Sequence, residues 1–314
     1  MNQPPKDCRY LVTGAAGFIG SHLGNRLFQL GNRVYGLDNY LHPVGAPPLF
    51  KIERADVRDF EYLAISAKNA DAIIHLAAAI NIDWGQTFPE LAWQINVDGT
   101  RNVLEVARRF DIPVIYASSS EVYGTAQATA MSETHPLDGQ SIYSASKIAG
   151  DRLCRAYVLE HEMQINVVRL FNTMGYYQGD DSYGGVIAKF TRQALENKPM
   201  TIYGSCEQRR DYLWIDDAVN AYLLALTTRF PGPINFGTGT TVSVLDIARG
   251  VAELCGLSPS GPKTLWEHDK PRRGEVDCLR ADWSKAKALG WEPKTSFANG
   301  LYNYIEWAKR QRQI

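Results

Sequence analysis

The feature that most constrains the fold is a glycine-rich turn near the amino terminus. Gly14, Gly17 and Gly20 recur every third residue, between a strand-like run over 10–13 and a helix-like run over 18–30. Glycines at such a turn let the backbone approach a pyrophosphate, and the positive end of the following helix faces its charge. The spacing differs from the usual GxGxxG fingerprint, and it also suits an ordinary turn, so the surrounding sequence has to decide.

Strand-like and helix-like segments alternate through the first half of the chain. Some strand-like runs, such as residues 72–76, are apolar on both faces, as in parallel strands that helices cover on both sides. The expected strands span residues 10–13, 33–37, 72–76, 114–117 and 165–170, and the expected helices span residues 18–30, 90–110 and 143–160. The predicted fold class is α/β, a Rossmann-like doubly wound parallel sheet with a smaller carboxyl-terminal α/β lobe.

The sequence changes in character after Leu170. Elements become shorter, and proline is more frequent between them. We expect a first domain over 1–174, with some later segments crossing back, and a second lobe over 175–314. Within the second half, residues 172–185 are loop-like, and helices are predicted over 186–197, over 217–228 and from Ser243, which Asp246 follows as a capping signal.

Composition narrows the classes of partner and compartment. The 314 residues carry a formal net charge of −1, with 45% hydrophobic and 21% charged residues. This composition gives no overall positive field to bind nucleic acid or an anionic membrane. The first residues lack a signal-peptide pattern, and the longest nearly unbroken apolar run, 72–80, is too short to span a bilayer. Five widely spaced cysteines without CxxC, and no HExxH, predict a cytoplasmic protein without disulfides or metal.

An acidic residue ends the second expected strand. Asp38 lies 24 residues after Gly14, and a carboxylate at this place can accept both hydroxyls of a ribose. The same charge repels a 2′-phosphate, so the pattern favours NAD over NADP. The alternative is a surface residue in a turn.

A tyrosine and a lysine share one face of the helix expected over 143–160. Tyr143 and Lys147 are four residues apart, which places them one turn apart. A lysine ammonium and the positive nicotinamide ring of NAD would both favour the phenolate. Lowering a tyrosine pKa from ~10 by roughly three units requires about 4 kcal/mol of differential stabilisation. The alternative is an exposed pair of the kind common on helices.

Three serines follow the strand expected over 114–117, where α/β sheets place their site residues. Small hydroxyls there can hold a reacting oxygen and relay its proton. Ser118 and Ser120 also suit ordinary turn hydroxyls, which are frequent after strands.

Taken together, these motifs resemble the extended short-chain dehydrogenase/reductase family, in its branch of NAD-dependent nucleotide-sugar epimerases and dehydratases. The resemblance spans nearly the whole chain. It includes Thr-Gly-x-x-Gly-Phe-Ile-Gly from Thr13, Asp56-Val57, His75-Leu76-Ala77-Ala78 and Asn96-Val97-x-Gly99-Thr100. It implies an NAD site formed by Gly14, Gly17, Phe18, Ile19, Gly20, Asp38, Asn39, Asp56, Val57, Leu76, Ala77 and Ala78, with Tyr143 and Lys147.

The resemblance also implies catalytic roles for Ser119, Glu121, Tyr143 and Lys147. Dehydratases of the family resemble Thr-Asp-Glu in this segment, whereas this chain has Ser120 at the Asp position, which weakens a C4,C6-dehydratase. Glu121 remains, either as an acid or base or as an acceptor of backbone N–H groups in the turn. The decarboxylase-like Arg-Lys-Pro-Asp is replaced by Leu-Arg-Ala-Asp over 279–282, so decarboxylation ranks lower.

Substrate contacts follow from the same resemblance. Ser119, Ser120, Asn172, Arg210 and Arg272 match residues that meet the sugar nucleotide or its diphosphate, although arginine pairs in loops are also often solvated charge. The family often continues after the asparagine with Tyr-Gly-Pro-Arg, where this chain reads Met-Gly-Tyr-Tyr over 174–177.

The favoured activity is 4-epimerisation of a nucleotide-diphosphate sugar through a transient 4-keto intermediate, with NAD regenerated. Dehydration with help from Glu121 is the main alternative. Decarboxylation, net reduction and a non-catalytic dinucleotide sensor are less favoured. The resemblance also implies a homodimer formed through the helices that begin at Glu90 and Tyr143.

Overall fold

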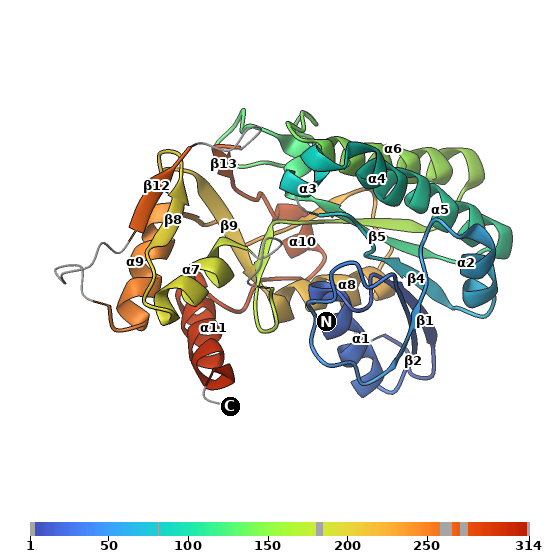
Figure 1. The fold of residues 1–314 in the computed structure, drawn as a ribbon. Helices are drawn as coiled ribbons and strands as arrows, with labels where there is room; N and C mark the ends of the chain where they lie inside the picture. The colour runs from blue at the N-terminus through green and yellow to red at the C-terminus, as the bar shows by residue number, and fades with distance from the viewer. Residues whose placement is uncertain (1–3, 81, 180–184, 258–265, 271–275, 313–314) are drawn as a thin grey trace.

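A seven-stranded parallel sheet organises the molecule (Figure 1). The computed structural model describes residues 4–80, 82–179, 185–257, 266–270 and 276–312. The strand order is β10-β6-β5-β4-β1-β2-β3. The strands are β1 (Arg9–Thr13), β2 (Arg33–Asp38), β3 (Lys51–Arg54), β4 (Ala72–His75), β5 (Val114–Ser119), β6 (Ile165–Leu170) and β10 (Ile234–Phe236). The predicted α/β class and parallel sheet are confirmed.

Helices cover both faces of the sheet because side chains of each strand alternate between the faces. On β1, Val12 packs into one core with Leu23, whereas Leu11 packs into the opposite core with Leu63 and Val103. The first face is covered by α1 (Phe18–Gln29) and α8 (Ile215–Thr227), and the second by α2 (Phe60–Ala67), α5 (Gly99–Phe110) and α6 (Ile142–His161) (Figure 1).

The helix predicted over residues 90–110 is interrupted. It consists of α4 (Pro89–Trp93), a π-helical turn over Gln94–Asp98 and α5, and α3 (Ile82–Thr87) precedes it. The prediction of one regular helix is therefore wrong at this turn. A single π-helical turn inserts an extra residue per hydrogen-bonded ring, so it re-aims the side chains it carries.

The smaller lobe lies on the left of Figure 1, beside the central sheet. Its four-stranded sheet consists of β7 (Asn172–Met174), β9 (Arg209–Trp214), β11 (Thr241–Ser243) and β13 (Cys278–Leu279), and β8 (Met200–Tyr203) pairs with β12 (Trp266–Asp269). Its helices are α7 (Val186–Leu195), α9 (Val244–Leu254), α10 (Ser284–Ala288) and α11 (Phe297–Gln311). The capping box predicted for α9 is present, since the Ser243 hydroxyl accepts from the Asp246 N–H.

One detail of the second half differs from the sequence-based expectation, and a second concerns the expected crossing back of later segments. Residues 172–174, predicted as loop, form β7 because their backbone pairs in parallel with β9 in the register Asn172↔Tyr212. The chain also returns to the central sheet after residue 174, as β10 pairs with β6 in the register Phe236↔Leu170.

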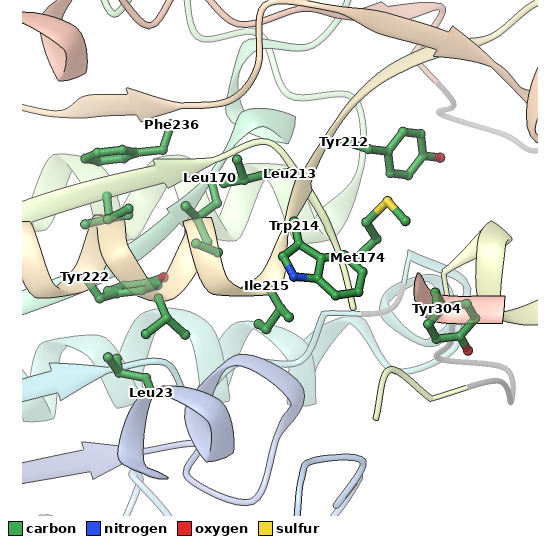
Figure 2. Close-up of a cluster of buried hydrophobic side chains, with 14 of the residues drawn as sticks. Leu23, Leu170, Met174, Tyr212, Leu213, Trp214, Ile215, Tyr222, Phe236 and Tyr304 are labelled. Atoms are coloured by element: carbon green, nitrogen blue, oxygen red, sulfur yellow. The ribbon is translucent and has the colours of Figure 1, made fainter. Parts of the chain in front are cut away.

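One apolar core joins the central sheet to the smaller lobe. It extends from Leu23 on α1 through Leu170 and Trp214 to Tyr304 on α11 (Figure 2). The boundary between two domains at residue 174 therefore stays a prediction. No helix within the described residues is long and apolar enough to cross a bilayer.

Candidate active site

A cavity of about 500 Å³ lies at the carboxyl ends of the central strands. This is where open α/β sheets bind ligands. All twelve glycine-turn, strand-end and loop residues predicted to bind NAD line it, namely Gly14, Gly17, Phe18, Ile19, Gly20, Asp38, Asn39, Asp56, Val57, Leu76, Ala77 and Ala78. So do the predicted Ser119, Ser120, Glu121, Tyr143, Lys147 and Asn172. The fold thus brings together residues that lie up to 158 positions apart in the chain.

The glycine turn is fixed by close backbone packing. Gly14 has a φ of +70°, and its N–H donates to the Leu37 carbonyl over 2.8 Å. A Cβ at Gly14 would lie 2.7 Å from the Ala77 nitrogen, so only glycine fits between β1 and the segment after β4. The turn therefore presents bare backbone to the cavity, as binding of a pyrophosphate requires.

Asp38 ends β2 beside this turn. Its Oδ2 accepts from the Ala16 N–H over 2.9 Å, and its Oδ1 accepts from the Tyr40 N–H over 2.7 Å. Burial raises the pKa of Asp38, and these two N–H groups oppose the rise. Each carboxylate oxygen has a second acceptor position, so hydrogen bonds to ribose hydroxyls remain possible. These features fit the adenosine half of NAD.

A neutral histidine joins the strands beneath the turn. His75 Nδ1 lies 2.8 Å from the Thr13 hydroxyl, and its Nε2 lies 3.0 Å from the Thr100 hydroxyl. Burial lowers the pKa of His75 to about 3, so the ring carries no charge at neutral pH. The histidine therefore holds β1, β4 and α5 in register without placing a charge under the cavity.

The π-helical turn connects the loop after β4 to α6. Asn96 on this turn accepts from the Ala79 N–H over 2.7 Å and donates to the Ala79 carbonyl over 3.0 Å. Its amide also donates to the Ser146 hydroxyl over 2.8 Å. All partners are buried, so the turn fixes how α6 sits against the cavity.

The first two turns of α6 carry the predicted tyrosine and lysine. A capping box between Ser141 and Ser144 starts the helix. The Tyr143 hydroxyl hydrogen-bonds the Ser119 side chain. One turn later, Lys147 Nζ donates to the Ala117 carbonyl over 2.9 Å. Serine, tyrosine and lysine thus converge on the end of β5.

The acidity predicted for Tyr143 needs a correction. Burial raises the pKa of Tyr143 to about 12, and the Glu121 charge adds to the rise while the Ser119 hydrogen bond opposes it. Burial also lowers the pKa of Lys147 to about 8. The prediction that Lys147 supports the phenolate is therefore not met by the protein's own groups. A lowered pKa depends on a further cation, such as a nicotinamide ring.

The serine segment at the end of β5 stabilises a local turn and also supplies side chains to the cavity. The Ser119 hydroxyl accepts from the Glu121 N–H over 3.2 Å and caps the short 3₁₀ helix over Ser120–Tyr123. Ser120 is buried, and Glu121 lines the cavity. Ser119 therefore serves the local turn while its hydroxyl also meets Tyr143.

Behind the serines lies a buried ionic network that the sequence analysis missed. Asp151 Oδ2 accepts from the Ser118 hydroxyl over 2.7 Å, and both Asp151 oxygens accept from Arg169, over 3.0 and 3.1 Å. Arg169 also donates to the Tyr123 hydroxyl, which donates to Asn235 on β10. The position of Asp151 four residues after Lys147 is a signal that would have placed it on the same helix face.

One of the two predicted arginines, Arg210, does not join this cluster. Arg210 does not line the cavity, and its Nη1 donates to the carbonyls of Arg209 and Asp277 over 3.1 and 3.4 Å. The neighbouring Asp211 is buried and accepts from the Thr238 and Gly239 N–H groups, which orders the loop there. Arg272 lies outside the described residues. A diphosphate contact by either arginine stays a prediction.

Three further polar side chains line the cavity from the other side. They are Gln178 after β7, Lys189 on α7 and Tyr222 on α8. No motif marks them in the sequence, because the place of Gln178 and Lys189 depends on the packing of the smaller lobe and that of Tyr222 on the packing of α8 against the central sheet. Within the described residues, no group of three or more metal-binding side chains comes together.

Comparison with known proteins identifies the family. The family model described as "NAD dependent epimerase/dehydratase family" matches residues 10–237. The chain belongs to this family. UDP-glucose 4-epimerase of Mycolicibacterium smegmatis is 32% identical, over 97% of this chain and 100% of that protein.

Solved structures of the family share the whole architecture. The crystal structure of UDP-glucose 4-epimerase from Thermotoga maritima with UDP-glucose has a TM-score of 0.90 and 27% identity, and covers 97% of this chain and 99% of that one. The dTDP-glucose 4,6-dehydratase from Streptomyces venezuelae, with NAD bound, has a TM-score of 0.89 and 28% identity, and covers 97% and 98%. The predicted family, enzyme class and NAD dependence are confirmed.

Proposed function

We propose that this enzyme is a 4-epimerase of nucleotide-diphosphate sugars. The observation that carries the proposal is the hydrogen bond between the Tyr143 hydroxyl and Ser119 inside a cavity that Lys147 also lines. A 4-epimerase needs a base at the C4 hydroxyl, a hydrogen-bonding partner for that oxygen and a bound nicotinamide. The similarity to UDP-glucose 4-epimerases supports this activity.

The cofactor is proposed to lie along the glycine turn, with its adenosine ribose at Asp38 and its nicotinamide towards Tyr143 and Lys147. When bound, NAD takes the hydride of sugar C4 and returns it, so no net oxidation occurs. Asn39 donates to Asp56 Oδ2 over 3.1 Å, which organises the edge of the adenine region.

Tyr143 is proposed to take the proton of the sugar C4 hydroxyl and later to give it back. Ser119 holds the same sugar oxygen, since its hydroxyl already meets the tyrosine hydroxyl. Lys147 is proposed to hold a positive charge one turn from the base, which favours the phenolate form only together with the nicotinamide ring of a bound cofactor. The 4-keto sugar is proposed to turn over within the cavity. Its reduction on the opposite face then inverts C4.

Dehydration is the alternative that a specific observation favours. Glu121 and Tyr143 both line the cavity, and the Glu121 charge raises the pKa of Tyr143, so the two groups interact electrostatically. A carboxylate so placed suits removal of a proton next to the 4-keto group. Against dehydration, the acid that precedes this glutamate in dehydratase-like segments is Ser120 here.

The substrate's diphosphate is proposed to lie near Asn172, with Arg210 and Arg272 as the contacts implied by resemblance. Lys189 is a cation that lines the cavity from the smaller lobe, and it suits an anionic group. The nucleotide base is to be identified by comparing uracil, guanine, thymine and cytosine.

The proposal is tested with a panel of nucleotide-diphosphate sugars carrying these four bases. A thermal-shift screen with NAD selects the binding sugar, and NMR then identifies the product. We expect the C4 epimer, with no net change in NADH absorbance. A 4-keto-6-deoxy product would identify a dehydratase, carbon dioxide release a decarboxylase and stoichiometric NADH consumption a reductase. Binding of NAD without turnover of any sugar would support a sensor and overturn the proposal.

The Asp38→Asn variant is expected to bind NAD at least about 10-fold more weakly, because a charged hydrogen bond contributes roughly 1.5–3 kcal/mol. Its preference for NAD over NADP should also fall, since the charge that repels a 2′-phosphate is gone. Isothermal titration calorimetry measures both affinities. The control is Asp71→Asn, because Asp71 also accepts a backbone N–H, from Arg9, but does not line this cavity. Equal loss in both variants would argue against the assigned role.

We also propose a homodimer formed through α4 and α6. Large apolar side chains are exposed on these helices: Trp93 is 45% exposed, Ile142 39% and Leu159 68%. The two helices lie side by side on one outer face of the molecule (Figure 1). Burying such side chains in a partner interface is favourable.

The Trp93→Glu variant is expected to shift the protein from dimer to monomer, because a buried carboxylate without a partner is costly. Size-exclusion chromatography with light scattering measures the mass. Ile65→Glu is the matched control, since Ile65 is 75% exposed on α2, away from α4 and α6. A monomeric parent protein, or dissociation of the control as well, would contradict the proposed interface.

A cytoplasmic location is proposed as well. The five cysteines Cys8, Cys154, Cys206, Cys255 and Cys278 are all free thiols. Free thiols persist in reducing compartments, which supports this location.

A further inference from the structure

The ammonium group of Lys147 has unusual surroundings. The residue is 4% exposed, and its Nζ lies 2.9 Å from the Ala117 carbonyl and 5.2 Å from the centre of the Tyr116 ring. Within the described residues, no carboxylate forms an ion pair with it. A buried ammonium needs such partners, because burial penalises the charged form.

The nearest carboxylate is engaged elsewhere. Asp151, one turn further along α6, is held by two hydrogen bonds from Arg169 and one from Ser118. The other titratable groups around Lys147 are Cys154 on α6 and His75 on β4. His75 is neutral at neutral pH, and burial raises the pKa of Cys154, so that the thiol stays protonated. The Asp151 charge still favours the ammonium at a distance, and the Tyr116 ring face is a second side-chain contribution.

The Tyr116 ring is fixed by the helix that carries the lysine. Tyr116 is 1% exposed within β5, and its ring centre lies 5.9 Å from that of His75. A Cβ at Gly150 would lie 2.1 Å from the Tyr116 hydroxyl oxygen, so this glycine leaves room for the ring tip. Gly150 lies three residues after Lys147 on the same helix. The packing of the ring against Gly150 therefore also fixes the position of the ring relative to Lys147.

Tyr116 does not itself ionise near neutral pH. Burial raises the pKa of Tyr116 well above its ordinary value, and the Asp151 charge adds to the rise. A neutral phenol ring presents a negative face to a cation within about 6 Å, and the attraction grows when both are shielded from water. The 5.2 Å separation satisfies this condition.

We propose that Tyr116 is a positioning residue whose ring face stabilises the Lys147 ammonium and holds it one turn from Tyr143. Its consequence for turnover rests on the proposed function, whereas its effect on the lysine does not. The role requires an aromatic face and does not require the hydroxyl.

The predicted effect is a change in the titration of Lys147. Burial already lowers the pKa of Lys147 to about 8. Removing the ring face removes an interaction that favours the charged form, so the pKa should fall further, by about one unit. Because the ammonium is lost as the pH rises through this pKa, the charge should then be lost at a lower pH.

The experiment compares Tyr116→Leu with Tyr116→Phe, in the protein without substrate. The Nζ resonance of Lys147, assigned with Lys147→Met in lysine-labelled protein, is followed by NMR over pH 6–10. We expect the Phe variant to keep the parent titration to within a few tenths of a unit and the Leu variant to titrate about one unit lower. If Tyr116→Leu does not fold, Tyr116→Met fills similar volume without a ring.

Equal Lys147 titration in the ring-keeping and ring-lacking variants would overturn the proposal. In the active enzyme, the alkaline limb of kcat should move to lower pH in the ring-lacking variant alone, with little change in KM. Since the NMR titration is independent of any reaction, it separates failure of this role from failure of the epimerase assignment.

Discussion

The Tyr143→Phe variant is expected to lose turnover by about 10²–10⁴-fold, the usual contribution of a positioned acid or base. The variant lacks only the hydroxyl that meets Ser119 in the cavity. The ring remains, and the glycine turn and Asp38 are untouched, so NAD should bind with nearly unchanged affinity. The expected pattern is a low kcat together with an intact cofactor complex.

Turnover is measured by NMR with the sugar identified in the panel, and NAD binding by calorimetry. Tyr157→Phe is the matched control, because Tyr157 lies on the same helix but donates to Glu105 and does not line the cavity. The control should keep turnover to within about 2-fold, in line with a surface substitution. Near-normal turnover in Tyr143→Phe would defeat the proposed mechanism, whatever the product.

Local patterns in the sequence were sufficient to bring the residues proposed to bind NAD to one cavity. The glycine turn lies between a strand and a helix, and Asp38 ends the next strand, so both are fixed by short stretches of chain. Tyr143 and Lys147 are likewise related by a single helical turn. Because parallel strands all end at one edge of the sheet, residues after separate strands meet there without further information.

The spacing of residues in the sequence does not predict the pKa of Tyr143. The i, i+4 pattern places the lysine on the correct face, but the Lys147 ammonium donates to the Ala117 carbonyl. Burial then dominates, and the pKa of Tyr143 rises to about 12. Desolvation depends on the packing of the whole site, and no local motif reports it.

Contacts that involve the smaller lobe were also difficult to predict. Lys189 lines the cavity from α7, which packs against α9, α11 and β8 of the smaller lobe, whereas Arg210 takes part in the pairing of β9 with β13. The sequence pattern did not predict the π-helical turn at Asn96, because the residues of this turn are also compatible with a regular helix. In each case an interaction with a distant segment overrides the local preference.

The buried pair formed by Asp151 and Arg169 gives the largest expected effect on stability. Each side chain is 4% exposed, and the pair links α6, β5 and β6 behind the serines. Asp151→Asn should lower the free energy of unfolding by about 3–5 kcal/mol, because it leaves the arginine charge buried without its partner. Denaturant unfolding at fixed protein concentration measures the loss.

The double variant Asp151→Asn with Arg169→Met decides whether the loss comes from the uncompensated charge. With no charge left to bury, the double variant should recover at least about 1–2 kcal/mol relative to Asp151→Asn alone, since replacing both partners of a buried pair is often nearly neutral. Its turnover should nevertheless stay low, because Ser118 has lost the carboxylate that holds the serine segment against α6. Losses that simply add in the double variant would show that the two side chains act independently. The ionic network would then contribute packing alone, and the alignment of Ser119 with Tyr143 would rest on the helix cap and the 3₁₀ turn.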